Sequence, residues 1–198
     1  AKCLFNTGIA YNNLGDFKRM EQFILTSLEI ETKLYGESSP LLLRSLSALV
    51  TAYLNLNDYS KAISFGNRAL KLISISNEND NSDIAILYTN IGVSHARLSD
   101  YSKAGLYLEQ AESIYKKNSL AEDGNYINLL NSLAVTYFFL GLNDKSDEYF
   151  NKGLKKIKSS KSAMSFNFLN SFAVTLGNAG KIRNGEILIT SALAKAEN

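Results

Sequence analysis

The chain has 198 residues, of which 45% are hydrophobic and 20% charged, and it contains a single proline. This composition excludes a disordered linker and provides enough apolar residues for one or two folded domains. One cysteine and one histidine can form neither an internal disulfide nor a closed zinc site. A net charge of +2 is too weak to predict binding to nucleic acid or to an anionic membrane.

No stretch of the sequence is typical of a targeting or membrane segment. The first residues lack the charged-then-apolar profile of a signal peptide. The uncharged stretches 124–143 and 162–180 contain several asparagines and serines, which are costly in hydrocarbon. No Asn-x-Ser/Thr sequon occurs, which favours an intracellular or bacterial setting over eukaryotic secretion. We therefore expect a cytoplasmic protein with no membrane partner.

An internal repeat runs along the whole chain. Five similar segments recur at intervals of 42, 42, 42 and 39 residues, centred on Tyr11, Tyr53, His95, Tyr137 and Leu176. Each segment predicts two antiparallel helices joined by a short turn such as LGD, LND or LSD. In chain order the predicted helices are 2–14, 17–34, 40–56, 59–75, 83–98, 101–117, 125–140, 143–158, 163–179 and 182–196.

Small and large residues alternate within this frame. Three residues before each centre the side chain is small in four of the five segments, the positions being Gly8, Val50, Gly92, Ala134 and Ala173. Seven residues before each centre it is large and apolar, the positions being Leu4, Leu46, Tyr88, Leu130 and Leu169. Small residues at helical spacing allow one helix to approach another closely, while large residues fill the remaining gaps.

The pattern resembles the tetratricopeptide repeat (TPR), in five copies over essentially the whole chain. The signature is large–small–aromatic in the first helix, glycine–x–aromatic at the turn (Gly15, Phe17) and small–small in the second helix (Ala62, Ala69). No proline ends a second helix, and the period exceeds the usual 34 residues, as in the long-period, kinesin light chain-like variety.

The resemblance implies an all-α fold, a right-handed α-solenoid of five stacked antiparallel helix pairs. We expect one solenoid domain over 1–198, with repeats at about 1–38, 39–80, 81–122, 123–161 and 162–198. The chain begins inside a predicted first helix and ends without an additional capping helix, and solenoids need polar terminal units. We therefore also expect a fragment of a longer chain.

Three features could suggest further chemistry, but each has a structural explanation. Cys3 and His95 lie two repeats apart, and His95 occupies a position that is tyrosine in three sister repeats. The oxygen-rich loop 77–83 lacks the glycine and the glutamate of a calcium loop. Lysines between 152 and 161 lie at the end of a predicted second helix, where they complement the helix dipole. We expect no enzyme, no metal, no cofactor and no nucleic-acid partner.

The resemblance also implies a binding surface, because stacked first helices line a concave face. The predicted peptide- or protein-binding residues are Phe5, Asn6, Ile9, Asn12, Arg44, Ser47, Thr51, Thr89, Asn90, Val93, Arg97, Asn128, Asn131, Val135, Phe138, Asn170 and Val174. Phe5 and Ile9 stand where the family's chaperone-tail binders carry the lysine and asparagine of a carboxylate clamp. We therefore do not expect that clamp.

The predicted groove is rich in asparagine, which offers hydrogen-bond donors and an acceptor to the backbone of an extended peptide. The leading hypothesis is a non-enzymatic protein–protein interaction scaffold that binds a peptide, a partner protein or another domain of the same chain. The alternative hypothesis is a regulatory or sensor region of a larger effector chain, such as a CHAT-type protease, a sensor kinase or a transcription regulator. The plainest interpretation is that these asparagines only keep solvent-facing helices soluble.

Overall fold

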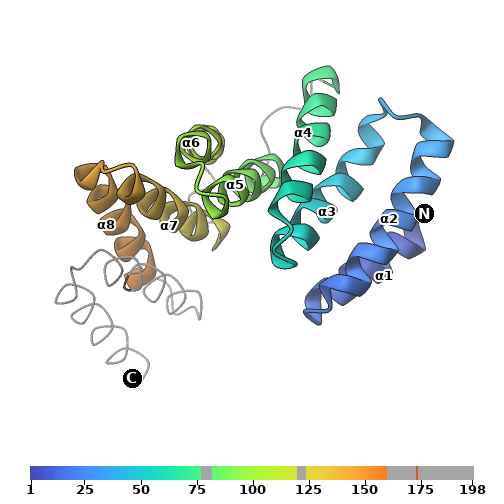
Figure 1. The fold of residues 1–198 in the computed structure, drawn as a ribbon, viewed down its shortest axis with the longest axis horizontal. Helices are drawn as coiled ribbons and strands as arrows, with labels where there is room; N and C mark the ends of the chain where they lie inside the picture. Colours follow the sequence, from blue (N-terminus) through green and yellow to red (C-terminus); the bar gives the residue numbers. More distant parts are fainter. Residues whose placement is uncertain (77–81, 120–123, 160–172, 174–198) are drawn as a thin grey trace. The chain divides into compact units, whose positions relative to one another are not determined.

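The computed structural model describes residues 1–76, 82–119, 124–159 and 173, and its described elements are helices (Figure 1). In chain order they are α1 (Lys2–Asn13), α2 (Phe17–Tyr35), a 3₁₀ turn η1 (Pro40–Leu42), α3 (Leu43–Asn55), α4 (Tyr59–Ser76), α5 (Ser82–Arg97), α6 (Tyr101–Lys117), α7 (Gly124–Phe139) and α8 (Asn143–Ser159). The predicted helices 163–179 and 182–196 lie outside the described residues.

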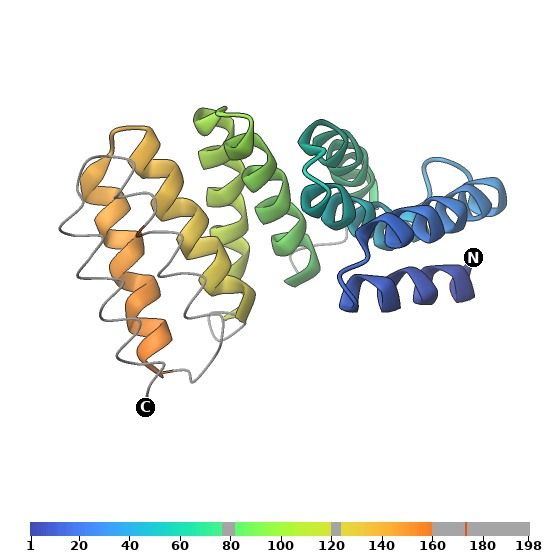
Figure 2. The same ribbon diagram turned by 60° about the horizontal axis from the view of Figure 1, so that its bottom comes forward.

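The prediction of paired helices is confirmed within the described residues. Helices α1 and α2, α3 and α4, and α7 and α8 pack as antiparallel neighbours joined by short turns (Figure 2). Predicted helix boundaries agree with the structure to within one residue, except that the third helix begins at Leu43 instead of Pro40. Ser39 accepts a hydrogen bond from the Leu41 N–H, and residues 40–42 form a tighter 3₁₀ turn before the α-helix.

Each turn within a helix pair reaches the left-handed backbone region at the same place in the repeat. The residues are Gly15, Asn57, Ser99 and Gly141, with φ of 73°, 60°, 63° and 75°. In the first three pairs an aspartate follows, at Asp16, Asp58 and Asp100. Each of these carboxylates accepts a hydrogen bond from the backbone N–H three residues later, at 3.0, 3.2 and 3.2 Å. This cap satisfies a free backbone N–H group at the start of a second helix. It explains why the starts of α2, α4 and α6 could be predicted correctly from the sequence.

Stacked aromatic rings join the two helices of each described pair. The ring pairs are Tyr11–Phe23, Tyr53–Phe65, His95–Tyr107 and Tyr137–Tyr149, with centroids 5.5, 5.4, 5.3 and 5.4 Å apart. The second member always lies twelve residues after the first and therefore repeats every 42 residues as well. Aromatic pairs at this spacing contribute stability beyond their buried area.

Glycines occur where helices approach most closely. A Cβ atom built on Gly8 would lie 2.6 Å from Cδ1 of Ile24, and one built on Gly66 would lie 2.5 Å from Cγ1 of Ile91. Both isoleucines are fully buried, so a side chain added at either glycine would have to displace part of the core. Glycine is therefore required at these contacts by packing.

The chain divides into two compact units, Ala1–Tyr107 and the residues from Leu108 onward, with the boundary inside α6. In the second unit the buried Glu112 accepts a hydrogen bond from the Tyr149 hydroxyl at 2.8 Å and pairs with Lys116 at 2.8 Å. The all-α fold of stacked helix pairs is confirmed, while the single domain over 1–198 stays a prediction. No described helix is long and apolar enough to cross a membrane.

Candidate functional site

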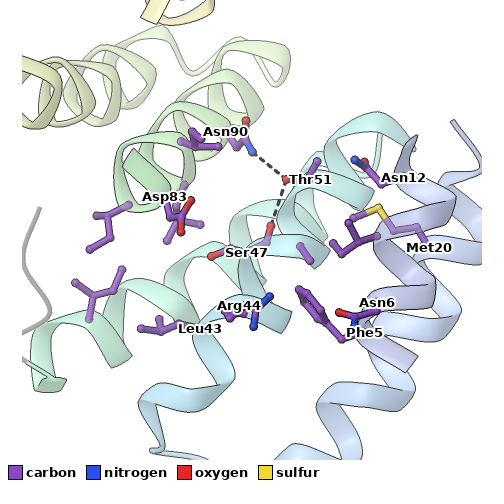
Figure 3. Close-up of a pocket in the computed structure, with 16 residues that line it drawn as sticks. Phe5, Asn6, Asn12, Met20, Leu43, Arg44, Ser47, Thr51, Asp83 and Asn90 are labelled. Carbon is purple, nitrogen blue, oxygen red and sulfur yellow. Dashed lines mark hydrogen bonds between the residues drawn. The ribbon is translucent and has the colours of Figure 1, made fainter. Parts of the chain in front are cut away.

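The first unit contains a pocket of about 460 Å³ on the side where its first helices meet. Helix α3 contacts both α1 and α5, so side chains from three successive repeats reach the same hollow (Figure 3). A volume of this size is typical of sites for small ligands or for a few residues of a peptide.

The lining combines an apolar base with several polar groups. The apolar members are Phe5, Ile9, Met20, Leu43, Ala48, Ile73, Ile84, Ile86 and Leu87. The polar and charged members are Asn6, Asn12, Arg44, Ser47, Thr51, Asp83 and Asn90. Such a surface suits a ligand that has apolar side chains and a hydrogen-bonding backbone.

A short hydrogen-bond relay crosses the pocket between two repeats. The Asn90 side-chain N–H on α5 donates to Thr51 Oγ1 on α3 at 3.2 Å, and the Thr51 hydroxyl donates to the Ser47 carbonyl at 3.3 Å (Figure 3). These bonds orient the Asn90 carboxamide, whose oxygen and second N–H are not used in the relay. The pocket therefore holds an amide group in a defined orientation.

The two charged lining residues lie on different helices. The Arg44 guanidinium on α3 lies over the Phe5 ring of α1, with its central carbon 4.7 Å from the ring centroid. Asp83 lies in the first turn of α5, on another side of the pocket, and is exposed (Figure 3). Arg44 is exposed as well, so both charges are accessible to a ligand.

Eight of the predicted binding residues come together in this pocket, all from the first three repeats. They are Phe5, Asn6, Ile9, Asn12, Arg44, Ser47, Thr51 and Asn90. On the same helix as Asn90, Thr89 is buried and its hydroxyl donates to the Ala85 carbonyl at 2.8 Å. Val93 and Arg97 lie further along α5 and are not among the lining residues.

The remaining predicted residues lie elsewhere in the chain. Asn128, Asn131, Val135 and Phe138 belong to α7 of the second unit, where Phe138 makes an edge-to-face contact with Phe139. Asn170 and Val174 lie outside the described residues. For these positions a binding role stays a prediction.

The sequence did not single out Met20, Leu43, Ile73, Asp83, Ile84 and Leu87 as lining residues. A signal was available for Asp83 and Leu87, because they continue the helical stripe that carries Asn90 at spacings of three and four residues. Met20 and Ile73 belong to the second helices α2 and α4, so their presence depends on how the pairs stack.

Two of the features set aside on sequence grounds, His95 and Lys152, have packing or pairing partners in the structure. His95 is buried against Tyr107, and burial lowers the pKa of its imidazole although Asp100, 3.4 Å away, opposes the shift. Among the described residues no three His, Cys, Asp or Glu side chains are grouped to hold a metal. Lys152 is paired with Glu148 at 2.6 Å, and most of loop 77–83 lies outside the described residues.

Comparison with known families decides the class of the chain. Tetratricopeptide repeat models match residues 3–74 and residues 85–118 and 127–155, which is more than half of the sequence. The chain belongs to the tetratricopeptide repeat family. TPR arrays are protein–protein interaction scaffolds, so the family indicates that class of function. No curated protein matches the chain.

Solved structures support the TPR fold and its long-period variety. A kinesin light chain-like protein of Podosopora anserina with nearly identical TPR-like repeats matches with a TM-score of 0.77 and 14% identity, over 98% of this chain and 93% of that one. BtubC (BKLC) from P. vanneervenii matches with a TM-score of 0.76 and 18% identity, over 96% and 77%. A Rap protein in complex with competence and sporulation factor matches with a TM-score of 0.68 and 16% identity, over 98% and 62%. At these identities the likeness concerns the fold.

Proposed function

We propose that this TPR protein is a non-enzymatic interaction module that binds an extended peptide segment on the first-helix face of residues 1–107. The observation that carries the proposal is the pocket shared by α1, α3 and α5. The segment belongs to a partner protein or to another domain of the same chain, since either source offers the same backbone and side-chain chemistry.

Polar groups of the pocket are suited to peptide backbone. Asn6, Asn12 and Asn90 each carry two amide donors and one carbonyl acceptor, and backbone offers the complementary groups at every residue. Because Thr51 already orients Asn90, binding does not have to pay for ordering that side chain. Recognition through amides is compatible with many sequences and gives general affinity for extended segments.

Apolar groups of the pocket are suited to side-chain anchors. Phe5, Ala48 and Leu87 are almost fully buried, while Ile9, Leu43 and Ile86 are partly exposed and can cover a bound side chain. Interfaces derive most of their affinity from a few such buried anchors. The Rap neighbour, whose structure holds competence and sporulation factor, supports the view that a related fold can accommodate a ligand.

Selection from a random peptide library tests the proposal. A phage-displayed dodecapeptide library is panned against the protein, and enriched peptides are measured by calorimetry against wild type, Asn90→Ala and Ser47→Arg. Ser47→Arg places a long side chain in the pocket and should abolish binding. Asn90→Ala should weaken it at least about tenfold, which corresponds to about 1.4 kcal/mol, with helicity and Tm nearly unchanged.

The matched control is Lys71→Glu, a charge reversal at an exposed position of the second helix α4. It should leave the affinity within about twofold, because Lys71 is not a lining residue and salt screens the charge of an exposed side chain. If Lys71→Glu abolishes binding while both pocket variants are silent, the peptide binds another face and the proposal is wrong.

A further inference from the structure

We propose that the pocket selects a dipolar segment: an acidic group of the ligand pairs with Arg44, a basic group pairs with Asp83, and adjoining backbone of the ligand pairs with Asn90. This inference rests on the proposed function and adds the charge pattern of the ligand. It concerns the first unit alone, since every lining residue lies within residues 1–107.

Arg44 has the geometry of an anion receptor. The Phe5 ring at 4.7 Å supports the guanidinium face, which leaves the N–H edges to donate in the plane of the group. Within the described residues no carboxylate pairs with Arg44. Many other basic residues do have acidic partners, for example Lys33 with Glu29 at 2.7 Å and Lys61 with Asp58 at 3.1 Å.

Asp83 offers the opposite charge at the same pocket. Its carboxylate is exposed, and among the described residues no lysine or arginine pairs with it. Asp100, in contrast, is paired with Lys103 at 3.1 Å. Since an exposed carboxylate at a pocket attracts a cationic group and repels an anionic one, Asp83 makes a wholly acidic ligand unfavourable.

The Asn90 relay places a neutral hydrogen-bonding group in the pocket that the two charges share. Asn90 is held by Thr51, and Figure 3 shows both of them in the same pocket as Arg44 and Asp83. A ligand with one acidic side chain, one basic side chain and an accessible stretch of backbone offers a complementary group to each of the three. A wholly basic ligand fails at Arg44 for the same reason that a wholly acidic ligand fails at Asp83.

Defined peptide pools test this charge pattern. Each pool holds acetylated and amidated decapeptides with a randomised apolar centre, flanked by Glu on one side and Lys on the other in both orders, or by Glu, Lys or Gln on both sides. Immobilised wild type should capture a Glu–Lys pool about tenfold better than the other pools. Arg44→Gln and Asp83→Asn should each remove that preference, and Lys71→Glu should keep it.

Exchanging the charges of Arg44 and Asp83 tests whether these two residues set the charge preference. The double variant Arg44→Glu with Asp83→Lys should prefer the best wild-type peptide with its Glu and Lys exchanged, by a similar factor. Both positions are exposed, and circular dichroism melts check that the variants fold.

The outcomes separate this inference from the proposed function. If all pools bind equally, and Ser47→Arg removes that binding, the charge pattern is wrong and the peptide-binding function stands. A Glu–Lys preference that survives Arg44→Gln and Asp83→Asn also overturns the charge pattern. If no pool binds, or if binding is insensitive to Ser47→Arg, both proposals are wrong.

Discussion

At the residue scale, the aromatic position of each first helix controls how its helix pair closes. Tyr53 and Tyr137 are almost fully buried and stack on Phe65 and Tyr149. His95 occupies the same position, is 8% exposed and stacks on Tyr107. The histidine therefore serves packing, and burial favours its neutral form because a charged imidazole would lose solvation.

This environment predicts an acid-sensitive contribution to stability from His95. Its pKa in the folded chain lies below the ordinary value of 6.5, so the unfolded chain binds the proton first as the pH falls. Stability should decrease as the pH falls from 7.5 through 6.5 towards the folded-state value. His95→Tyr removes that component, so its urea midpoint should vary less between pH 7.5 and 5.5 than that of wild type.

If wild type and His95→Tyr lose stability in parallel over this pH range, the imidazole does not titrate differently in the two states. His95→Tyr should also fold at least as stably as wild type at pH 7.5, since tyrosine occupies this position in three sister repeats. Severe destabilisation at that pH would show that the repeat register is misassigned.

At the scale of elements, the helix boundaries could be predicted because residues close to each boundary in the sequence determine where a helix begins and ends. Asp16, Asp58 and Asp100 cap second helices, and the residues before them turn through the left-handed region. The 3₁₀ turn at Pro40–Leu42 was missed, because a serine and a proline indicate a helix start without specifying its first turn. The second aromatic of each stack repeats every 42 residues, yet its partner becomes evident only from the folded pair.

The contact between α4 and α5 gives a prediction at this scale. Gly66→Leu forces a large side chain against Ile91, which is fully buried, and overpacking of this kind costs about 1–3 kcal/mol. Ser64→Leu, at an exposed position of the same helix, should change the free energy of unfolding by less than about 0.5 kcal/mol. Urea denaturation of the two variants makes the comparison. Equal stability of Gly66→Leu and Ser64→Leu would contradict the close packing of these helices.

At the scale of the whole molecule, the lining residues contributed by first helices could be predicted from the sequence better than those contributed by second helices. Asn6 and Asn90 follow from the repeat, because they occupy equivalent positions two 42-residue periods apart, and equivalent positions of first helices face the same side. Met20 and Ile73 could not be predicted, since they reach the pocket from second helices and their positions depend on how successive pairs stack. The binding residues proposed in the fourth and fifth repeats, such as Asn131 and Asn170, stay predictions.

Binding of a peptide segment to the first-helix face of residues 1–107 can be observed residue by residue. The measurement is heteronuclear NMR of ¹⁵N-labelled protein, titrated with a peptide from the library selection. Binding in the pocket should shift the side-chain amide signals of Asn6, Asn12 and Asn90 and the backbone amides of α1, α3 and α5. Shifts confined to outward positions of the second helices, such as Arg68 and Lys71, with silent asparagine side chains, would contradict it.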